Sequence, residues 1–168
     1  MPKVEIEKKY IILKPRPEEM SLMEEYKSSE IVQIYLPTKN GVTHRIRSRK
    51  QMDGSVSYTE TKKTRIDKMS AYEDEIVIDK KTFDSLALCI DDGTRPIVKT
   101  RHTFLYCGQL FEIDFYPNYK HTCIMETELD ERDKEVVFPP FIRIIANVTG
   151  NQRYTNASMS KSFPEELV

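Results

Sequence analysis

Charged side chains alternate with apolar ones along several short stretches of this chain, beginning almost at its first residue. Read as a β-strand, residues 4–10 (VEIEKKY) place Glu5, Glu7 and Lys9 on one face, whereas Val4, Ile6 and Tyr10 lie on the other. One such stretch alone is typical of a half-exposed strand. Because the alternation recurs down the chain, it predicts a mainly β protein whose sheet has one charged face and one apolar face.

Turn residues and proline divide the chain into short elements. Asn40-Gly41, Asp53-Gly54 and Gly108 mark hairpin turns. We expect strands over 4–10, 31–36, 43–49, 56–62, 72–78, 97–104, 110–116, 123–129 and 142–148, and helices over 18–26, 79–89 and 157–162.

The repeated charges fall into an acidic set and a basic set. The acidic set is Glu5, Glu7, Glu73, Glu75, Glu112, Asp114, Glu126 and Glu128, and the basic set is Lys9, Arg45, Arg47, Lys62, Lys99 and Arg101. Arg49 extends a row with Arg45 and Arg47, and such a row is unfavourable unless anions meet it. The apolar faces carry enough Val, Ile, Phe and Tyr to pack against helices.

A sheet of this kind can close into a barrel with the charged face inward, and about eight strands leave room for a small ligand. Unpaired buried charges are costly, so the lumen must be hydrated, internally paired or filled by a charged ligand. Mixed acids and bases suit a polyanion with its divalent cation, since carboxylates hold hard cations and Arg and Lys hold phosphate oxygens. The alternative is an open sheet with salt bridges across its solvent face, which contribute little stability.

Composition limits the other possibilities. The 168 residues suit one domain spanning 1–168, and the 26 basic and 27 acidic residues leave a net charge of −1, which gives no indication of nucleic-acid binding. No apolar run is long enough to span a membrane, and the first residues lack the apolar core of a signal peptide. Three cysteines without CxxC spacing read as reduced thiols. We therefore expect a cytoplasmic protein, either a monomer or a homodimer, that binds neither nucleic acid nor membrane.

In their order along the chain, these motifs resemble the CYTH superfamily, the triphosphate tunnel metalloenzymes, and particularly its short bacterial inorganic tripolyphosphatases. Glu5-Ile6-Glu7-Lys8-Lys9 resembles the ExExK motif of that family. The later matches are Gln33 to Leu36, Arg45-Ile46-Arg47, Lys62, Glu73 to Glu75, Lys99-Thr100-Arg101, Glu112-Ile113-Asp114, Glu126-Thr127-Glu128, Val148-Thr149-Gly150 and Arg153 to Asn156. One departure is Glu60, a charge where an apolar residue is usual beside the family's lysine.

The resemblance implies an α+β, mainly β fold: a closed antiparallel eight-stranded barrel with a charged lumen, helices packed outside, and Mg²⁺ or Mn²⁺ with a triphosphate inside. It implies metal ligands at Glu5, Glu7, Asp114, Glu126 and Glu128 and phosphate-binding residues at Lys9, Arg45, Arg47, Lys62, Lys99 and Arg101. Glu126 or Glu128 would orient the attacking water, and Glu73, Glu75 and Asp114 would assist by orienting basic side chains, water or metal.

The function expected from this resemblance is metal-dependent hydrolysis of the terminal phosphate of a linear triphosphate, foremost inorganic tripolyphosphate. The alternatives are a class IV-type adenylyl cyclase, a nucleoside or thiamine triphosphatase, and a non-catalytic polyphosphate-binding module. The many carboxylates argue against the last, because binding an anion needs the bases but not so many acids.

Overall fold

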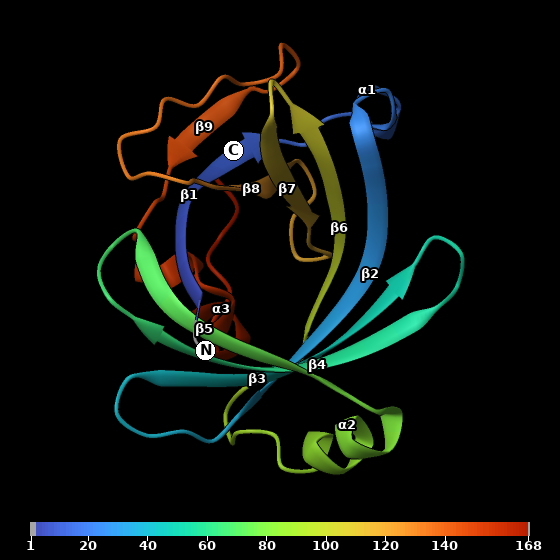
Figure 1. Ribbon diagram of the computed structural model, residues 1–168, viewed down its shortest axis with the longest axis vertical. Coiled ribbons are helices and arrows are strands. Elements are labelled where there is room, and N and C mark those ends of the chain that lie inside the picture. Colours follow the sequence, from blue (N-terminus) through green and yellow to red (C-terminus); the bar gives the residue numbers. More distant parts are fainter. Residues whose placement is uncertain (1–2, 168) are drawn as a thin grey trace.

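One continuous antiparallel sheet of nine strands runs through residues 3–167, the part of the chain that the computed structural model describes. The strand order is β5-β4-β3-β2-β6-β7-β8-β1-β9, and an additional β5–β1 pairing closes the first eight strands into the predicted barrel (Figure 1). The strands are β1 (Lys3–Leu13), β2 (Glu24–Leu36), β3 (Val42–Gln51), β4 (Val56–Arg65), β5 (Ser70–Ile78), β6 (Ile97–Tyr106), β7 (Gln109–Phe115), β8 (Thr122–Glu128) and β9 (Ile144–Asn147).

Tight turns set the register of the hairpins. Between β6 and β7 the two-residue turn Cys107-Gly108 has φ values of 49° and 71°, so Tyr106 pairs with Gln109. Both residues of this turn type need positive φ, which glycine adopts without strain. Asn40 and Gly41 also have positive φ, in the loop between β2 and β3, where the sequence predicts a turn.

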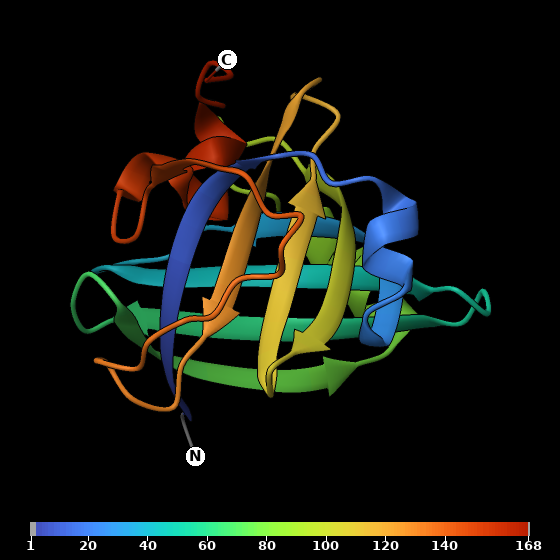
Figure 2. The ribbon, with the colours of Figure 1, turned by 90° about the horizontal axis from the view of Figure 1, so that it is seen from above.

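The outer face of the barrel carries the apolar core. The helix α2 (Lys80–Ala87) begins after Asp79, whose side chain accepts a hydrogen bond from the Thr82 backbone N–H, as an N-cap does. Its Phe83 packs with Ile46 on the outside of β3. Elsewhere the loop after β8 supplies Phe138 to a second outer cluster around Tyr10. Figure 2 shows the strands curving around the interior, with α1 (Pro17–Ser21) beside them.

The prediction of a helix over 18–26 is wrong for the second half of that range. It ends at Ser21, and β2 begins at Glu24. Pairing with β6 explains the change, because β2 continues from Lys27 opposite Thr103 and the Tyr26 hydroxyl lies 2.8 Å from Nδ1 of His102. A positive φ of 53° at Glu25 marks the irregular start of this pairing.

Two short helical elements lie at one end of the barrel rather than along its wall. The short segment η1 (Gln152–Tyr154) and the helix α3 (Asn156–Lys161) lie within the outline of the barrel in Figure 1 and border its interior at one end. Within residues 3–167, no helix is long and apolar enough to cross a membrane.

Candidate functional site

The barrel encloses a tunnel, a cavity of about 580 Å³ whose walls are mostly charged. Its acidic lining residues are Glu5, Glu7, Glu73, Glu75, Glu112, Glu126 and Glu128, and its basic ones are Lys3, Lys9, Arg45, Arg47, Arg49, Lys63, Arg65 and Arg101. Most residues of both predicted sets therefore meet in one cavity.

Strand register brings together carboxylates that are far apart in the sequence. Along β1 and β8, Glu7 lies opposite Glu128 and Lys9 lies opposite Glu126, while Glu112 on β7 lies on the other side of Glu126. Directly opposed residues share a face of the sheet, so these side chains form one continuous patch on the inner wall.

The structure corrects the predicted position of one lysine. Lys62 lies opposite His44 on the outer face of β4 and is exposed, whereas Lys63 lies opposite Thr43 and Glu73 on the inner face and lines the tunnel. Charges stand on both faces of this strand, so alternation alone does not decide which lysine faces inward. The charge at Glu60, which forms a 2.6 Å pair with His44 on the outer face, is the signal that could have revealed the shift.

These two neighbouring lysines provide a matched test. Lys63→Ala removes a cation from the tunnel, and we expect it to weaken the binding of tripolyphosphate, used as a probe anion, about tenfold, the usual loss for one charge-assisted hydrogen bond. Lys62→Ala should leave the affinity within about twofold, because its side chain lies on the other face of the same strand. Calorimetric titration measures both, and a larger effect from Lys62→Ala would contradict this placement.

Asp114 and Lys99 lie behind the tunnel wall rather than in its lining. Asp114 accepts hydrogen bonds from Lys99 Nζ at 2.8 Å and from Arg101 Nε and Nη2 at 2.8 and 2.9 Å. The Lys99 and Asp114 side chains are 0% and 1% exposed. Both Asp114 oxygens therefore accept hydrogen bonds from cations. These contacts suit Asp114 to its other expected role, orienting basic side chains, better than to binding a metal ion.

Burial and charge act against each other in this cluster. Burial disfavours the ionised Asp114, but the adjacent Arg101 and Lys99 hold its pKa well below the usual carboxylate range. Burial also lowers the pKa of Lys99 to about 7 despite the Asp114 charge. Arg101 extends from this cluster to the tunnel, where its Nη1 lies 2.9 Å from Glu112. The cluster therefore fixes the direction of one tunnel arginine.

Lysines hold three of the four glutamates expected to bind metal. Nζ of Lys63 lies 2.8 Å from Glu5, and Lys9 and Lys3 each lie 3.2 Å from their partners, Glu126 and Glu128. Burial disfavours the charge on Glu126, but Lys9 and Arg101 outweigh burial and hold its pKa well below the usual value. Glu126 therefore stays ionised at neutral pH.

Glu7 is the fourth of these carboxylates. Its side chain has no ion-pair partner among residues 3–167. Burial, and then the nearby Glu126 charge, raise the pKa of Glu7 to about 8. A cation placed beside Glu7 and Glu126 would relieve this repulsion.

The donor chemistry therefore fits a hard divalent cation, which prefers carboxylate oxygens. As the side chains stand, however, no group of three or more His, Cys, Asp or Glu residues within 3–167 is placed to hold a metal ion. Since lysines hold three of the four carboxylates, a metal ion would have to replace lysine contacts of Glu5, Glu126 or Glu128.

The arginine row on β3 offers donors to an anion. Gln33 Oε1 accepts from Arg47 Nε and Nη2 at 3.1 and 2.8 Å, whereas the buried Nε atoms of Arg45 and Arg49 have no hydrogen-bond partner in the described residues. Burial, and then the neighbouring cations Arg45 and Arg101, lower the pKa of Arg47 to about 9. Buried donors without partners are costly, and phosphate oxygens would satisfy them.

A C-terminal latch, residues 162–167, lies beside the end of the tunnel that α3 borders. The Glu166 carboxylate accepts backbone hydrogen bonds from His121 and Thr122 at 2.6 and 2.7 Å. Phe163 packs edge-on against Tyr116, whose hydroxyl donates to Asn156 Oδ1 at 2.8 Å. Asn156 begins α3 and lines the tunnel, so the latch connects the end of the chain to the tunnel wall. Sequence analysis missed it, because no motif marks a carboxylate bound by a distant loop.

Glu166→Gln should weaken the contacts of the latch. Backbone donors outweigh partial burial and lower the pKa of Glu166 to about 2. Its contribution to stability is therefore present above its ordinary pKa of 4.5 and is lost as the pH falls below that value. At pH 7 we expect the variant to have a lower melting temperature and to bind tripolyphosphate more weakly than the wild type. Both differences from the wild type should become smaller in acid.

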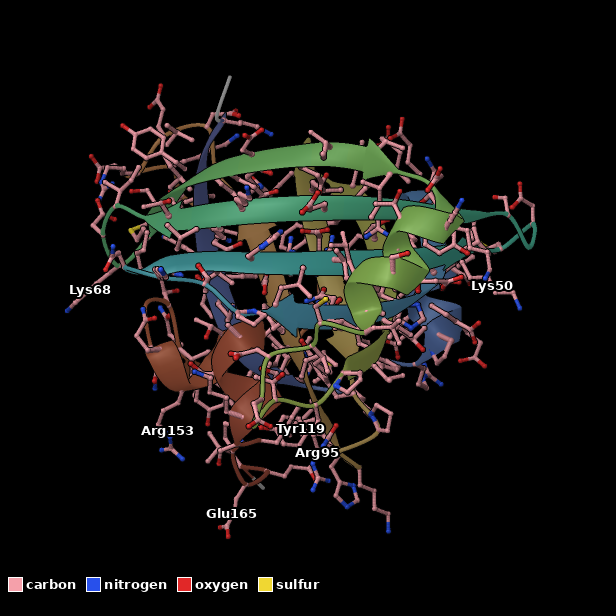
Figure 3. The ribbon with its side chains drawn as sticks, turned by 90° about the horizontal axis from the view of Figure 1, so that it is seen from below. Lys50, Lys68, Arg95, Tyr119, Arg153 and Glu165 are labelled. Carbon is pink, nitrogen blue, oxygen red and sulfur yellow. The ribbon has the colours of Figure 1, made fainter. Side chains whose placement is uncertain are left out.

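Glu165→Gln is the matched control, since this neighbouring carboxylate is exposed and points away from the protein in Figure 3. Equal losses in the two variants would show that Glu166 does not act through its bound carboxylate. Thermal unfolding from pH 3 to 8 measures the difference.

Comparison with known proteins adds to this geometry. No protein-family model and no curated protein matches the chain. Among solved structures, the inorganic triphosphatase NE1496 is 28% identical, with a TM-score of 0.61 over 95% of this chain and 96% of that chain. The PH1012 protein from Pyrococcus horikoshii, 17% identical with a TM-score of 0.56 over 77% of this chain and 81% of its own, shares the fold.

A putative adenylate cyclase from Bacillus halodurans shares the fold as well, at 14% identity and a TM-score of 0.50 over 79% of this chain and 83% of that chain. The closed eight-stranded antiparallel barrel is that of the CYTH fold, and the chain is similar over nearly its whole length to an inorganic triphosphatase.

Proposed function

We propose that this protein hydrolyses the terminal phosphate of a linear triphosphate, with inorganic tripolyphosphate as the preferred substrate and Mg²⁺ or Mn²⁺ as the metal. The observation that carries the proposal is the tunnel itself, in which buried arginine donors without partners lie across from a patch of carboxylates. Similarity to an inorganic triphosphatase supports triphosphatase activity in general.

In this proposal the basic residues bind and orient the substrate. Arg45 and Arg47 donate to phosphate oxygens, and Arg101, held by Asp114, adds a fixed donor that stabilises charge developing on the transferred group. Lys63, on β4, adds a further cation to the tunnel lining. Donors already held in place need little reorganisation during the reaction.

The tunnel carboxylates would hold the metal, and one of them, Glu126, would also orient water. Glu7, with Glu5, Glu126 and Glu128, would hold the metal, which when bound polarises the phosphoryl group. Glu126 stays ionised, so one of its oxygens can accept a hydrogen bond from the attacking water. The water oxygen forms a bond to the terminal phosphorus, the bridging P–O bond breaks, and orthophosphate and diphosphate result, with one proton released to solvent.

The tunnel lining favours an inorganic substrate over an organic one. Among the described lining residues, Tyr35 is the only aromatic one, and its hydroxyl is hydrogen-bonded to Gln33 at 3.1 Å. Two other aromatic residues of the barrel strands contact aromatic side chains elsewhere: Tyr58 packs against Phe83 under α2, and Phe115 contacts His102. A nucleobase or thiazole ring therefore finds little surface for stacking in the tunnel.

A substrate panel tests the proposal. Purified protein is assayed with tripolyphosphate, ATP and thiamine triphosphate, with Mg²⁺, with Mn²⁺ and with chelator, and both phosphate and cyclic AMP are quantified. We expect the highest kcat/KM for tripolyphosphate, and no turnover in chelator. Cyclic AMP as the main product from ATP would instead establish the cyclase alternative, and binding without turnover of any substrate would establish a binding module.

A further inference from the structure

The basic residues of the tunnel differ in the partners that hold them. Four of them form ion pairs with carboxylates at 3.2 Å or less: Lys3, Lys9, Lys63 and Arg101. Within residues 3–167, in contrast, Arg45, Arg47 and Arg49 form no ion pair with a carboxylate. The arginine row on β3 therefore keeps a positive charge that no acidic side chain compensates.

Gln33 is the side chain that holds the middle arginine of this row. It lies on β2 directly opposite Arg47 and is 0% exposed. Its Oε1 accepts hydrogen bonds from Arg47 Nε and Nη2 at 3.1 and 2.8 Å, and its Nε2 donates to the Tyr35 hydroxyl at 3.1 Å. A guanidinium group has donors only, so the amide atom that faces Arg47 must be the oxygen.

These contacts fix the direction in which the guanidinium group points. Gln33 occupies the edge of Arg47 that is formed by Nε and Nη2. The edge formed by Nη1 and the second N–H of Nη2 has no hydrogen-bond partner among the described residues, and Arg47 lines the tunnel. That edge carries two parallel donors, the arrangement that binds a phosphate group through two oxygens.

An uncharged acceptor fixes Arg47 without cancelling its charge. Asp114 provides the contrast, because it holds Arg101 through the same two nitrogens, Nε and Nη2, but does so with an anion. Burial, and then the cations Arg45 and Arg101, lower the pKa of Arg47 to about 9, as expected for a cation that lacks an anionic partner. A bound phosphate group would supply that anion.

We propose that Gln33 is a positioning residue of the triphosphate site, which fixes Arg47 through a neutral acceptor and so leaves both its free edge and its full charge for one phosphate group. The inference rests on the proposed function, because it takes the tunnel to bind phosphates. The two arginines then differ in one respect: Asp114 balances the charge of Arg101, whereas the substrate balances the charge of Arg47.

Two substitutions at Gln33 separate orientation from charge. Gln33→Glu keeps an acceptor for Arg47 but makes it an anion, and Gln33→Met keeps the length of the side chain but removes the acceptor. Gln51→Glu is the matched control, since it makes the same charge change four residues beyond Arg47 on β3, about 14 Å away, at a residue that does not line the tunnel.

Binding of tripolyphosphate is measured by calorimetric titration in chelator, where metal-dependent turnover does not disturb the heats, at several salt concentrations. Gln33→Glu should bind about tenfold more weakly, with a shallower salt dependence and a melting temperature no lower than that of the wild type. Gln33→Met should lose about as much affinity but keep the salt dependence of the wild type, because Arg47 keeps its charge. Gln51→Glu should bind within about twofold of the wild type.

A double-mutant cycle tests whether Gln33 acts through Arg47. Added to Arg47→Gln, the substitution Gln33→Met should weaken binding no further, since the group that Gln33 positions is already absent. A full further loss in the double variant would overturn the proposal. So would wild-type affinity in Gln33→Glu, or a loss of affinity in Gln33→Glu that accompanies an equally clear loss of melting temperature, because a purely structural role predicts the latter.

Failure of the proposed function gives a different result. Phosphate release by the wild type with Mg²⁺ is measured beside the titrations. Binding of tripolyphosphate without release of phosphate would reject the hydrolase and leave the comparison of the Gln33 variants decisive, because that comparison measures binding alone. A wild type that does not bind tripolyphosphate would reject both.

Discussion

Glu7→Gln should reduce the turnover of tripolyphosphate about a hundredfold or more while leaving the protein as stable as the wild type or slightly more stable. The loss is large because Glu7 is the tunnel carboxylate best placed to receive a cation, and charge-stabilising groups in sites with little water have effects of this size. Glutamine keeps the size of the side chain and removes its charge. The loss of turnover should accompany weaker binding of Mg²⁺.

The stability of this variant has a predictable pH dependence. In the folded protein without metal, burial and Glu126 raise the pKa of Glu7 from 4.5 to about 8. The folded state therefore holds a proton that the unfolded state releases, and Glu7 destabilises the wild type increasingly as the pH rises from about 4.5 to about 8. Glu7→Gln should remove this destabilisation, so the melting temperature of the variant should exceed that of the wild type by an amount that grows toward pH 8.

Asp74→Asn is the control, since this carboxylate lies opposite Lys62 on the outer face and is exposed. Steady-state kinetics, calorimetric Mg²⁺ titration and thermal unfolding in chelator measure the three effects. Near wild-type turnover in Glu7→Gln would refute a metal-binding role for Glu7.

Asp114→Asn should produce the largest loss of stability, about 3–5 kcal/mol, the range for breaking one side of a buried ion pair. Asparagine keeps the shape of Asp114 but leaves Lys99 and Arg101 without their shared anion in a buried site. Urea denaturation at pH 7 gives the free energy of unfolding. The same substitution should lower the affinity for tripolyphosphate, because Arg101 loses the contact that directs it into the tunnel.

Glu112→Gln tests whether the burial of Asp114 is the cause of the large stability loss in Asp114→Asn. Glu112 contacts the same Arg101 at 2.9 Å, but its side chain is 26% exposed. Water can replace that contact, so we expect a loss below about 1 kcal/mol. Equal losses in the two variants would contradict the distinction between the buried cluster and the tunnel edge.

Alternating charge predicted a sheet with a charged face and most of the residues on it, whereas closure into an eight-stranded barrel was implied by the resemblance to the CYTH superfamily. The period of two in 4–10 and in 123–129 assigns Glu5, Glu7, Glu126 and Glu128 to the charged face of their strands, and the structure places all four in the tunnel. This inference succeeds because each of these strands has apolar residues on its other face, and a shift by one residue would bury charge in the core.

Only the tertiary structure shows which charged residues of β4 face the tunnel and how deeply each charged side chain is buried. On β4, charges occupy both faces, and only the pairing of Lys63 with Thr43 and Glu73 shows that Lys63 rather than Lys62 faces the tunnel. Glu112 and Asp114 share a face, yet one lines the cavity and the other lies buried between Lys99 and Arg101. Local alternation determines the face on which a side chain lies. Its depth and partners depend on strands distant in sequence, because closure of the barrel sets which side chains meet.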